Sequence, residues 1–217
     1  MEHPRMTSQR AALAAAGAHL AALGLSPGSS GNLSVREGDR VCITPTGTDL
    51  SRIDPDALSV LDLDGALVSG PRPSKEFPLH TAFYQRDAEA RAVVHLHSRQ
   101  ATGASCLEPW SDKSALPPLT PYFVMRVGQT PLLPYAPPGD REQAERMRAL
   151  PFPFRAALLQ NHGPVVTGTS VRAAVETVVE LEETAALLLS LGTRTARLLT
   201  AEEARELARR YESPWGD

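Results

Sequence analysis

The sequence contains very little cysteine. Cys42 and Cys106 are the only two among 217 residues, and they lie far apart. Without a CxxC pair, the chain has no thiolate set for a closed four-ligand zinc site. We therefore expect two free thiols and a cytoplasmic location.

Long apolar runs and an excess of positive charge are also missing. No stretch approaches the roughly 20 apolar residues that span a bilayer. The Ala-rich run at 11–23 contains His19 and is followed by no clear cleavage site, so we expect an ordinary helix and no secretory signal. The net charge of −3 gives no general basic field. We therefore expect neither a nucleic-acid partner nor a membrane partner.

Lysine and asparagine are each present only twice, as Lys75, Lys113, Asn32 and Asn161. Avoidance of asparagine is consistent with a heat-adapted protein. The few positions of an otherwise avoided residue type become candidates for a specific role. Lys75 stands at the start of a predicted helix, where its charge opposes the helix dipole. An anionic ligand explains a cation at this place better than helix stability does.

Apolar periodicity and turn residues predict a mixed sheet with helices on its faces. No long Pro/Gly/Ser linker divides the chain, so we expect a single domain over residues 1–217. The predicted helices lie at 7–23, 74–86, from about 98, 140–150, 171–191 and 200–211. The predicted strands lie at 40–44, in a hairpin over 59–68, and at 91–97, 123–127, 156–160 and 164–167.

Three histidines are candidate metal ligands. His95 and His97 stand at i and i+2 of an apolar strand, so both imidazoles leave the same face. Two histidines on one face of a core strand are an unusual way to fill a core, which favours metal binding. His162 lies in a turn between two β-rich segments and supplies a third imidazole. Three protein ligands with an open fourth position are the pattern of a catalytic zinc.

Glu76 is the candidate general base. Glu76 and His80 are four residues apart on a predicted helix and therefore share one face. A carboxylate at a helix start is also favoured by the helix dipole alone, so its position by itself leaves both interpretations open. Beside a metal, the same carboxylate can collect protons that the ion acidifies.

Three short segments rich in Gly, Ser or Thr could offer backbone N–H groups and hydroxyls to a phosphate. They are Gly31-Asn32-Leu33-Ser34, Thr44-Pro45-Thr46-Gly47 and Ser74-Lys75-Glu76. Each segment alone is a weak signal, because such turns are common. Lys75 strengthens the third segment.

These motifs together resemble the class II aldolase/adducin family. The set is GNLS at 31–34, TPTG at 44–47, SKE at 74–76 with His80, VVHLH at 93–97 and NHG at 161–163. The resemblance runs in order over nearly the whole chain. It implies an α/β/α sandwich around a central, mostly antiparallel sheet, and a cyclic homotetramer.

The resemblance also implies roles for particular residues. It implies one Zn²⁺ per subunit on His95, His97 and His162, with Glu76 as the acid/base and as a metal ligand when substrate is absent. A tyrosine from a neighbouring subunit is implied as a proton donor, and Tyr122 is the best match, although its segment carries an extra residue. The implied phosphate contacts are Asn32, Thr46, Gly47, Ser74 and Lys75.

The implied activity is a zinc-dependent carbon–carbon lyase acting on a small phosphorylated sugar or keto acid through a metal-stabilised enediolate. The main expectation is an activity like that of L-fuculose-1-phosphate aldolase. The Ser-Lys-Glu sequence at 74–76 and PYAPPGD at 134–140 resemble instead the 3-oxo-tetronate 4-phosphate decarboxylases, which are the alternative. A sugar-phosphate 4-epimerase, a methylthioribulose-1-phosphate dehydratase and a non-catalytic adducin-like module are further alternatives.

Overall fold

One eight-stranded sheet forms the centre of the molecule. The computed structural model describes the backbone of residues 4–216 and the side chains of residues 8–216. The strands are β1 (Asn32–Glu37), β2 (Arg40–Ile43), β3 (Ser59–Asp62), β4 (Leu67–Ser69), β5 (Ala92–His95), β6 (Leu132–Leu133), β7 (Ala156–Leu159) and β8 (Gly163–Gly168). Their order in the sheet is β4-β3-β2-β1-β5-β8-β7-β6.

Neighbouring strands run antiparallel except at one edge, where β6 and β7 are parallel. Strand β5 lies between β1 and β8, and its last residue, His95, pairs with Asn32 on one side and Val165 on the other. The predicted mostly antiparallel sheet is therefore confirmed. His95 therefore lies in the middle of the sheet, and His97 follows it two residues later.

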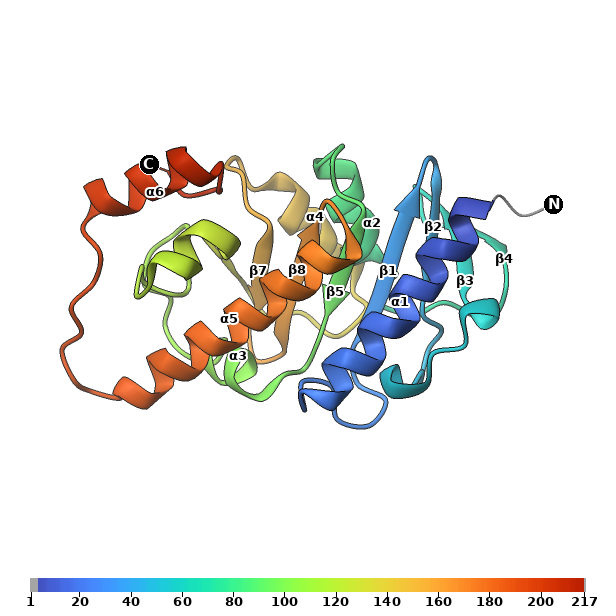
Figure 1. Cartoon of the computed structure of the whole chain (residues 1–217), viewed down its shortest axis with the longest axis horizontal. Coiled ribbons are helices and arrows are strands. Elements are labelled where there is room, and N and C mark those ends of the chain that lie inside the picture. The colour runs from blue at the N-terminus through green and yellow to red at the C-terminus, as the bar shows by residue number, and fades with distance from the viewer. Residues whose placement is uncertain (1–3, 217) are drawn as a thin grey trace.

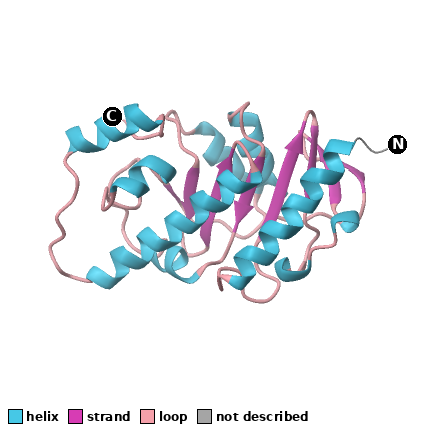
Figure 2. Ribbon diagram, in the orientation of Figure 1, coloured by secondary structure: helices cyan, strands magenta, loops and turns pink. Residues whose placement is uncertain are grey.

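Helices cover both faces of the sheet, which confirms the predicted α/β/α sandwich. In Figure 1, α1 and α5 cross one face, while α2 and α4 lie behind the strands. Figure 2 shows the same layers by secondary structure. No helix within residues 4–216 has the length and apolar character to cross a bilayer. The helices are α1 (Pro4–Ala22), α2 (Phe77–Arg86), α3 (Arg99–Ala104), α4 (Arg141–Ala149), α5 (Val171–Leu191) and α6 (Ala201–Tyr211), with short turns η1 (Leu50–Arg52), η2 (Pro55–Ala57) and η3 (Phe123–Val127).

The central strands bury both of their faces. Val94 and Val166 belong to the hydrophobic cluster that includes residues of α1 and α5. Val93 and Val165 belong to a second cluster with residues of α2 and α4. Because strand side chains alternate, His95 shares the side of Val93 and points toward α2. The strand therefore directs this histidine to the side of the sheet where Glu76 precedes α2.

The strand predicted at 123–127 is wrong, because this segment is the single π-helical turn η3. The buried residues are Phe123, Val124 and Val127, a spacing that suits one face of a helix. The Thr120 hydroxyl accepts a hydrogen bond from the Phe123 N–H at the start of the turn, and the Gly128 N–H donates to the Phe123 carbonyl at its end. A short apolar run does not by itself distinguish a strand from a helical turn.

Candidate active site

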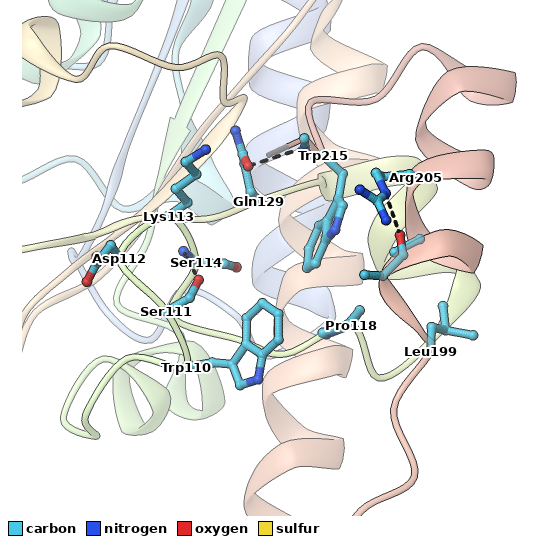
Figure 3. A pocket seen from close by; sticks show the side chains of 13 residues that line it. Trp110, Ser111, Asp112, Lys113, Ser114, Pro118, Gln129, Leu199, Arg205 and Trp215 are labelled. Atoms are coloured by element: carbon cyan, nitrogen blue, oxygen red, sulfur yellow. Dashed lines mark hydrogen bonds between the residues drawn. The ribbon is translucent and has the colours of Figure 1, made fainter.

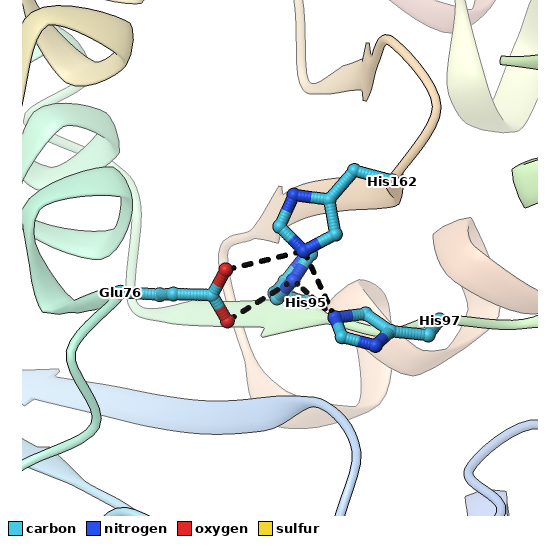
Figure 4. Close-up of side chains that lie close together, drawn as sticks. All are labelled: Glu76, His95, His97 and His162. Carbon is cyan, nitrogen blue, oxygen red and sulfur yellow. Dashed lines mark hydrogen bonds and ion pairs between the residues drawn. The ribbon is translucent and has the colours of Figure 1, made fainter. Parts of the chain in front are cut away.

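Four side chains converge at one end of β5. Glu76, His95, His97 and His162 each offer a ligand atom, and these atoms all lie within 4.8 Å of one another. The Nε2 atom of His97 lies 3.1 Å from Nε2 of His95 and 3.0 Å from Nε2 of His162. The Glu76 carboxylate lies 3.3 Å from His95 Nε2 and 3.2 Å from His162 Nε2. Figure 4 shows the three rings and the carboxylate facing a common centre.

The β7–β8 turn brings His162 to the two other histidines. Asn161 adopts a left-handed conformation with φ of 56°, and Gly163 has φ of 151°. A Cβ atom on Gly163 would lie 2.4 Å from the Leu96 carbonyl oxygen. Glycine is therefore required for the turn to approach the backbone between His95 and His97 this closely.

Helix α3 holds the segments on which His97 and His162 stand. It begins two residues after His97, and Glu182 of α5 caps its first turn. The buried Glu182 carboxylate accepts hydrogen bonds from Ser98 Oγ (2.7 Å) and from the backbone N–H groups of Gln100 and Ala101 (2.8 Å each). From the same helix, Thr102 Oγ1 donates to the His162 carbonyl oxygen at 3.1 Å.

The arrangement of the rings calls for positive charge at the centre of the cluster. The Pro164 carbonyl can only accept, so His95 Nδ1–H donates to it at 2.8 Å and Nε2 faces the cluster. His97 Nε2 lies about 3 Å from the other two ring nitrogens, and these atoms repel one another when all present lone pairs. A proton shared with the carboxylate, or a cation, removes this repulsion.

Electrostatic shifts agree with this requirement. Burial, followed by the charges of His95 and His162, lowers the pKa of His97 to about 4. Burial opposes ionisation of Glu76, but hydrogen bonds to His162 and His95 outweigh it, so the pKa of Glu76 lies well below its ordinary value. At neutral pH the cluster therefore combines an ionised carboxylate with a neutral His97, which is the protonation state that a metal ion requires.

The residues present fit a divalent metal ion. Imidazole and carboxylate are ligands of catalytic zinc and of related transition metals. Glu76 Oε1 is buried and faces His162 Nε2 at 3.2 Å, and no other donor among residues 8–216 satisfies it, although buried carboxylate oxygens normally have donors of the fold. The cluster is thus a candidate metal site, and the donor set alone does not select zinc over other transition metals.

Four of the five candidate phosphate-binding residues lie on two neighbouring loops, and the fifth, Asn32, begins β1. The Ser74 N–H donates to the Thr44 carbonyl at 3.2 Å, and Thr46 Oγ1 donates to the Pro73 carbonyl at 2.9 Å. Gly47 has φ of 80°, which suits a glycine turn. Asn32 is buried, and its Nδ2 donates to Glu76 Oε2 at 2.9 Å. Asn32 is therefore bound to the carboxylate itself.

Lys75 lies between the metal cluster and the loop that follows β6. Its side chain is exposed. A Cβ atom on Gly139 would lie 3.3 Å from Cβ and Cγ of Lys75, so the 134–140 loop passes closely over it. Its positive charge is among the causes that lower the pKa of His97, after burial and the other histidines. Lys75 therefore adds positive charge beside the cluster.

Tyr122 stands on a different segment, directly before η3. Its side chain is 56% exposed, and its ring lies under the guanidinium of Arg126. Among residues 8–216, no hydrogen bond connects Tyr122 to Glu76 or to the three histidines. Tyr122 is therefore not part of the bonded network around the histidines in this chain.

Sequence patterns did not identify the supporting role of three residues. The Ser34 hydroxyl lies 2.7 Å from both His80 Nδ1 and the Tyr84 hydroxyl, and Glu182 accepts from Ser98. Ser34 belongs to the GNLS motif and stands two residues after Asn32, so strand alternation could have placed it on the same face. Tyr84 follows His80 by four residues, which is also a same-face signal. Glu182 stands 85 residues after His97 in the sequence, and no local pattern connects them.

A separate cavity of about 420 Å³ lies between α6 and the 110–118 segment. Figure 3 shows Trp110 and Trp215 on its wall, with Lys113, Gln129 and Arg205 around it. The two indole rings are 6.1 Å apart with a tilt of 31°. None of the four cluster residues lines this cavity, so it is distinct from the candidate metal site.

Comparison with known proteins identifies the family. Residues 11–189 match the Class II Aldolase and Adducin N-terminal domain, and the chain belongs to this family. It is an enzyme of the lyase type found in the class II aldolase superfamily.

Particular relatives show which branch is nearer. The chain is 46% identical over 200 residues to 3-oxo-tetronate 4-phosphate decarboxylase of Pectobacterium atrosepticum, which covers 92% of both chains. It is 34% identical over 170 residues to L-fuculose phosphate aldolase of Escherichia coli, with 77% of this chain and 76% of that one covered. The crystal structure of YgbL from Klebsiella pneumoniae matches with a TM-score of 0.89 and 43% identity over 93% of this chain and 98% of that chain.

Proposed function

We propose that this protein is a 3-oxo-tetronate 4-phosphate decarboxylase. The observation that carries the proposal is the 46% identity to a decarboxylase of that name over 92% of both chains. The main expectation from the sequence, an activity like that of L-fuculose-1-phosphate aldolase, has weaker support, because the relative with that name is 34% identical. The decarboxylase, which the Ser-Lys-Glu sequence at 74–76 also favours, is therefore preferred to the aldolase.

The reaction follows from the chemistry of the substrate. A 3-oxo-tetronate is a β-keto acid, so loss of CO₂ breaks the bond between C1 and C2. The electron pair of that bond moves toward the C3 carbonyl oxygen, and C2 then gains a proton, which gives dihydroxyacetone phosphate. A divalent cation, which we propose to be one Zn²⁺ per subunit, supplies Lewis acidity toward the carbonyl when bound.

The residues of the cluster divide the work. His95, His97 and His162 hold the cation through their Nε2 atoms, which already converge on one centre. Glu76 is the residue placed to carry the proton that C2 gains, because its carboxylate borders that centre on the side of α2. Burial of the carboxylate keeps competing water away from it.

The neighbouring loops bind the two anionic ends of the substrate. Thr46, Gly47 and Ser74 supply the phosphate contacts that the family pattern implies, together with Asn32, whose NH₂ group has a second N–H besides the one that donates to Glu76. Lys75 adds a positive charge beside His97. We therefore propose that Lys75 binds the substrate carboxylate, which is the negative group nearest the reacting carbon. A simple sugar phosphate lacks the carboxylate that this lysine would attract.

We also propose the homotetramer that the family pattern implies. The exposed Tyr122 then acts on the cluster of a neighbouring subunit, because it has no bond to the cluster of its own. Sedimentation measurements test the assembly. Tyr122→Phe tests the role of the hydroxyl: unchanged kcat in a tetrameric variant would remove Tyr122 from the mechanism.

A substrate screen tests the proposed reaction. Purified zinc-loaded protein is given a 3-oxo-tetronate 4-phosphate, L-fuculose 1-phosphate or L-ribulose 5-phosphate, and release of CO₂, release of an aldehyde or isomerisation is measured. We expect CO₂ and dihydroxyacetone phosphate from the first substrate. Aldehyde release from fuculose 1-phosphate at a higher kcat/KM would replace the decarboxylase assignment with the aldolase.

Two variants refine this screen. His95→Ala should abolish both zinc binding and CO₂ release, and an active variant would contradict the assignment of the metal ligands. Lys75→Ser should reduce kcat/KM for the keto acid more than for a sugar phosphate that has no carboxylate. An equal loss on every substrate would instead assign Lys75 to the phosphate.

A further inference from the structure

A row of buried polar side chains leads away from Glu76 into the space between β1 and α2. Asn32 and Ser34 stand two residues apart on β1, and His80 and Tyr84 stand one turn apart on α2. None of these four residues is more than 3% exposed. Two same-face pairs, one on a strand and one on a helix, thus meet across the sheet–helix interface.

Hydrogen bonds connect the four residues to the carboxylate in sequence. Asn32 Nδ2 lies 2.9 Å from Glu76 Oε2, and Asn32 Oδ1 lies 2.5 Å from His80 Nε2. His80 Nδ1 lies 2.7 Å from Ser34 Oγ, which in turn lies 2.7 Å from the Tyr84 hydroxyl. A continuous line of hydrogen bonds therefore runs from Tyr84 in the core to Glu76 beside the histidines.

The Glu76 carboxylate fixes which partner donates in every hydrogen bond of this line. Ionised Glu76 can only accept, so Asn32 must present its NH₂ group to Glu76 and its carbonyl oxygen to His80. Neutral His80 then donates from Nε2, which leaves Nδ1 as an acceptor. Ser34 therefore donates to His80 and accepts from Tyr84. All four donors point toward Glu76.

The charges around His80 favour this neutral form. Burial, followed by the charge of His95, lowers the pKa of His80 to about 3, and the opposing effect of Glu76 is smaller. Burial also raises the pKa of Tyr84, so its hydroxyl keeps its proton and remains a donor. The ionisation states thus agree with the direction assigned to these hydrogen bonds.

We propose that His80, Ser34 and Tyr84 are positioning residues for Glu76. By fixing the His80 tautomer, Ser34 and Tyr84 hold the Asn32 amide in the one orientation that donates to Glu76 Oε2. The Glu76 carboxylate then keeps its Oε1 atom directed at the histidine cluster. The consequence for catalysis rests on the proposed function, whereas the direction of these hydrogen bonds can be measured without it.

Filling space does not account for this arrangement. Burying hydroxyl and imidazole groups costs free energy unless every hydrogen bond is made, and apolar side chains of similar volume would fill the same space. The neighbouring buried residues of α2, such as Leu79 and Phe83, are apolar and pack in the hydrophobic cluster. The buried hydroxyl of Thr81 on the same helix donates to the Pro78 carbonyl of its own backbone, whereas His80 and Tyr84 join the line that leads to Glu76, which favours a positioning role.

The first experiment measures the His80 tautomer by NMR, using two-bond ¹⁵N–¹H correlations of the imidazole in the zinc-loaded protein. We expect the neutral form with its proton on Nε2 in the parent protein. In Ser34→Ala, where Nδ1 loses its donor, we expect a mixture of tautomers. A His80 with its proton on Nδ1 in the parent protein would overturn the proposed direction.

The second experiment measures kcat, KM and zinc content for a graded set of variants. His80→Leu should lower kcat about 10- to 100-fold, as removal of such supporting partners does in other metal sites. Ser34→Ala should lower kcat about fivefold and Tyr84→Phe about threefold, the sizes expected for single neutral hydrogen bonds. KM and zinc content should change less than twofold. His80→Gln retains a donor near the Nε2 position and should restore most of the kcat lost in His80→Leu.

A matched control separates positioning from general disturbance of the core. Ser59 is also fully buried in the sheet, but its hydroxyl donates to the Pro71 carbonyl away from the chain. Ser59→Ala should leave kcat unchanged. If kcat in Ser34→Ala and Tyr84→Phe equals that of Ser59→Ala, or falls only with zinc content, the positioning role is wrong. If the parent protein releases no CO₂, the proposed function fails, and the NMR measurement still decides the direction of the chain.

Discussion

Two buried carboxylates stand beside helix starts, and their surroundings differ. Glu182 crosses from α5 to the start of α3 and accepts three hydrogen bonds there, from Ser98 Oγ and two backbone N–H groups. Glu76 immediately precedes α2, but its side chain caps no N–H group of that helix. Its Oε1 atom faces His162 Nε2 at 3.2 Å and accepts from no other donor among residues 8–216. The Glu182 carboxylate therefore stabilises the start of α3, whereas the Glu76 carboxylate faces three imidazoles.

The difference teaches how to separate a supporting acid from a reactive one when both are buried. Burial alone does not distinguish them, since both side chains are almost fully covered. What distinguishes them is whether every oxygen is satisfied by a donor of the fold. Four changes test this comparison, from the largest expected effect to the smallest.

Replacing Glu76 by Gln should affect chemistry and leave the fold intact. The substitution keeps the shape of the side chain but removes its ability to carry a proton, so kcat for CO₂ release should fall at least about 100-fold. The melting temperature should fall by a few degrees while the protein stays folded, because the lowered pKa of Glu76 means that its ionised form stabilises the fold at neutral pH. Glu142→Gln on the surface of α4 is the control for the same chemical change. A variant with more than one tenth of the parent kcat would remove Glu76 from proton transfer.

Replacing Glu182 by Ala should affect stability first. It leaves the start of α3 without its acceptor, and we expect a loss of about 3 kcal/mol in the free energy of unfolding, measured by urea denaturation. Zinc affinity should weaken about 10-fold because α3 holds the segments of His97 and His162. Glu183→Ala, the exposed neighbour on α5, is the matched control and should cost less than about 0.5 kcal/mol. Equal stability of the two variants would contradict the assigned role.

Stability should fall at mildly acidic pH because His80 is buried in its neutral form. The pKa of His80 is lowered to about 3 in the folded protein, from 6.5. A lowered folded pKa means that the stabilisation is complete above about pH 6.5 and is lost as the pH falls toward 3. By proton linkage, His80 alone accounts for a loss of about 2 kcal/mol at pH 5. His80→Gln should flatten this part of the pH profile of unfolding, and an unchanged slope would show that His80 is not buried as a neutral group.

Replacing Thr102 by Val should give the smallest change. It removes one hydrogen bond to the His162 carbonyl and keeps the volume of the side chain. We expect a loss of about 1 kcal/mol in stability and less than about 10-fold in zinc affinity, measured by competition with a chelating dye. Thr177→Val, which removes a similar hydroxyl bond within α5, should not change zinc affinity. Equal zinc affinities of the two variants would show that α3 does not position His162.

The histidine cluster could be predicted from the sequence because each residue carried a local signal. The HLH spacing directed two imidazoles to one place, and the NHG turn supplied a third. Glu76 was found because it stands beside Ser74 and Lys75 in a recognisable motif. Periodicity within single segments, such as the hairpin over 59–68, predicted a mixed sheet with helices on its faces, and the family resemblance implied the α/β/α sandwich.

Features that depend on contacts between distant segments could not be predicted. The bonds from Glu182 to the start of α3 depend on how α5 packs against α3, which no local pattern encodes. The π-helical turn at Phe123–Val127 depends on Thr120 and Gly128 at its two ends, while its apolar residues alone also suited a strand. The bond from Asn32 to Glu76 required the pairing of β1 with β5, since the motif alone assigned Asn32 to a phosphate.

The central position of β5 has a consequence for how the protein folds. Hairpins such as β1–β2 join residues that are close in sequence, as in the pair Glu37 and Arg40. The strands that assemble the cluster pair across much longer intervals, as in Asn32 with His95 and His95 with Val165. Pairings across long loops form slowly because loop closure costs entropy before the contacts are made. The chain should therefore complete its histidine cluster late in folding, after the β1–β4 hairpins have formed.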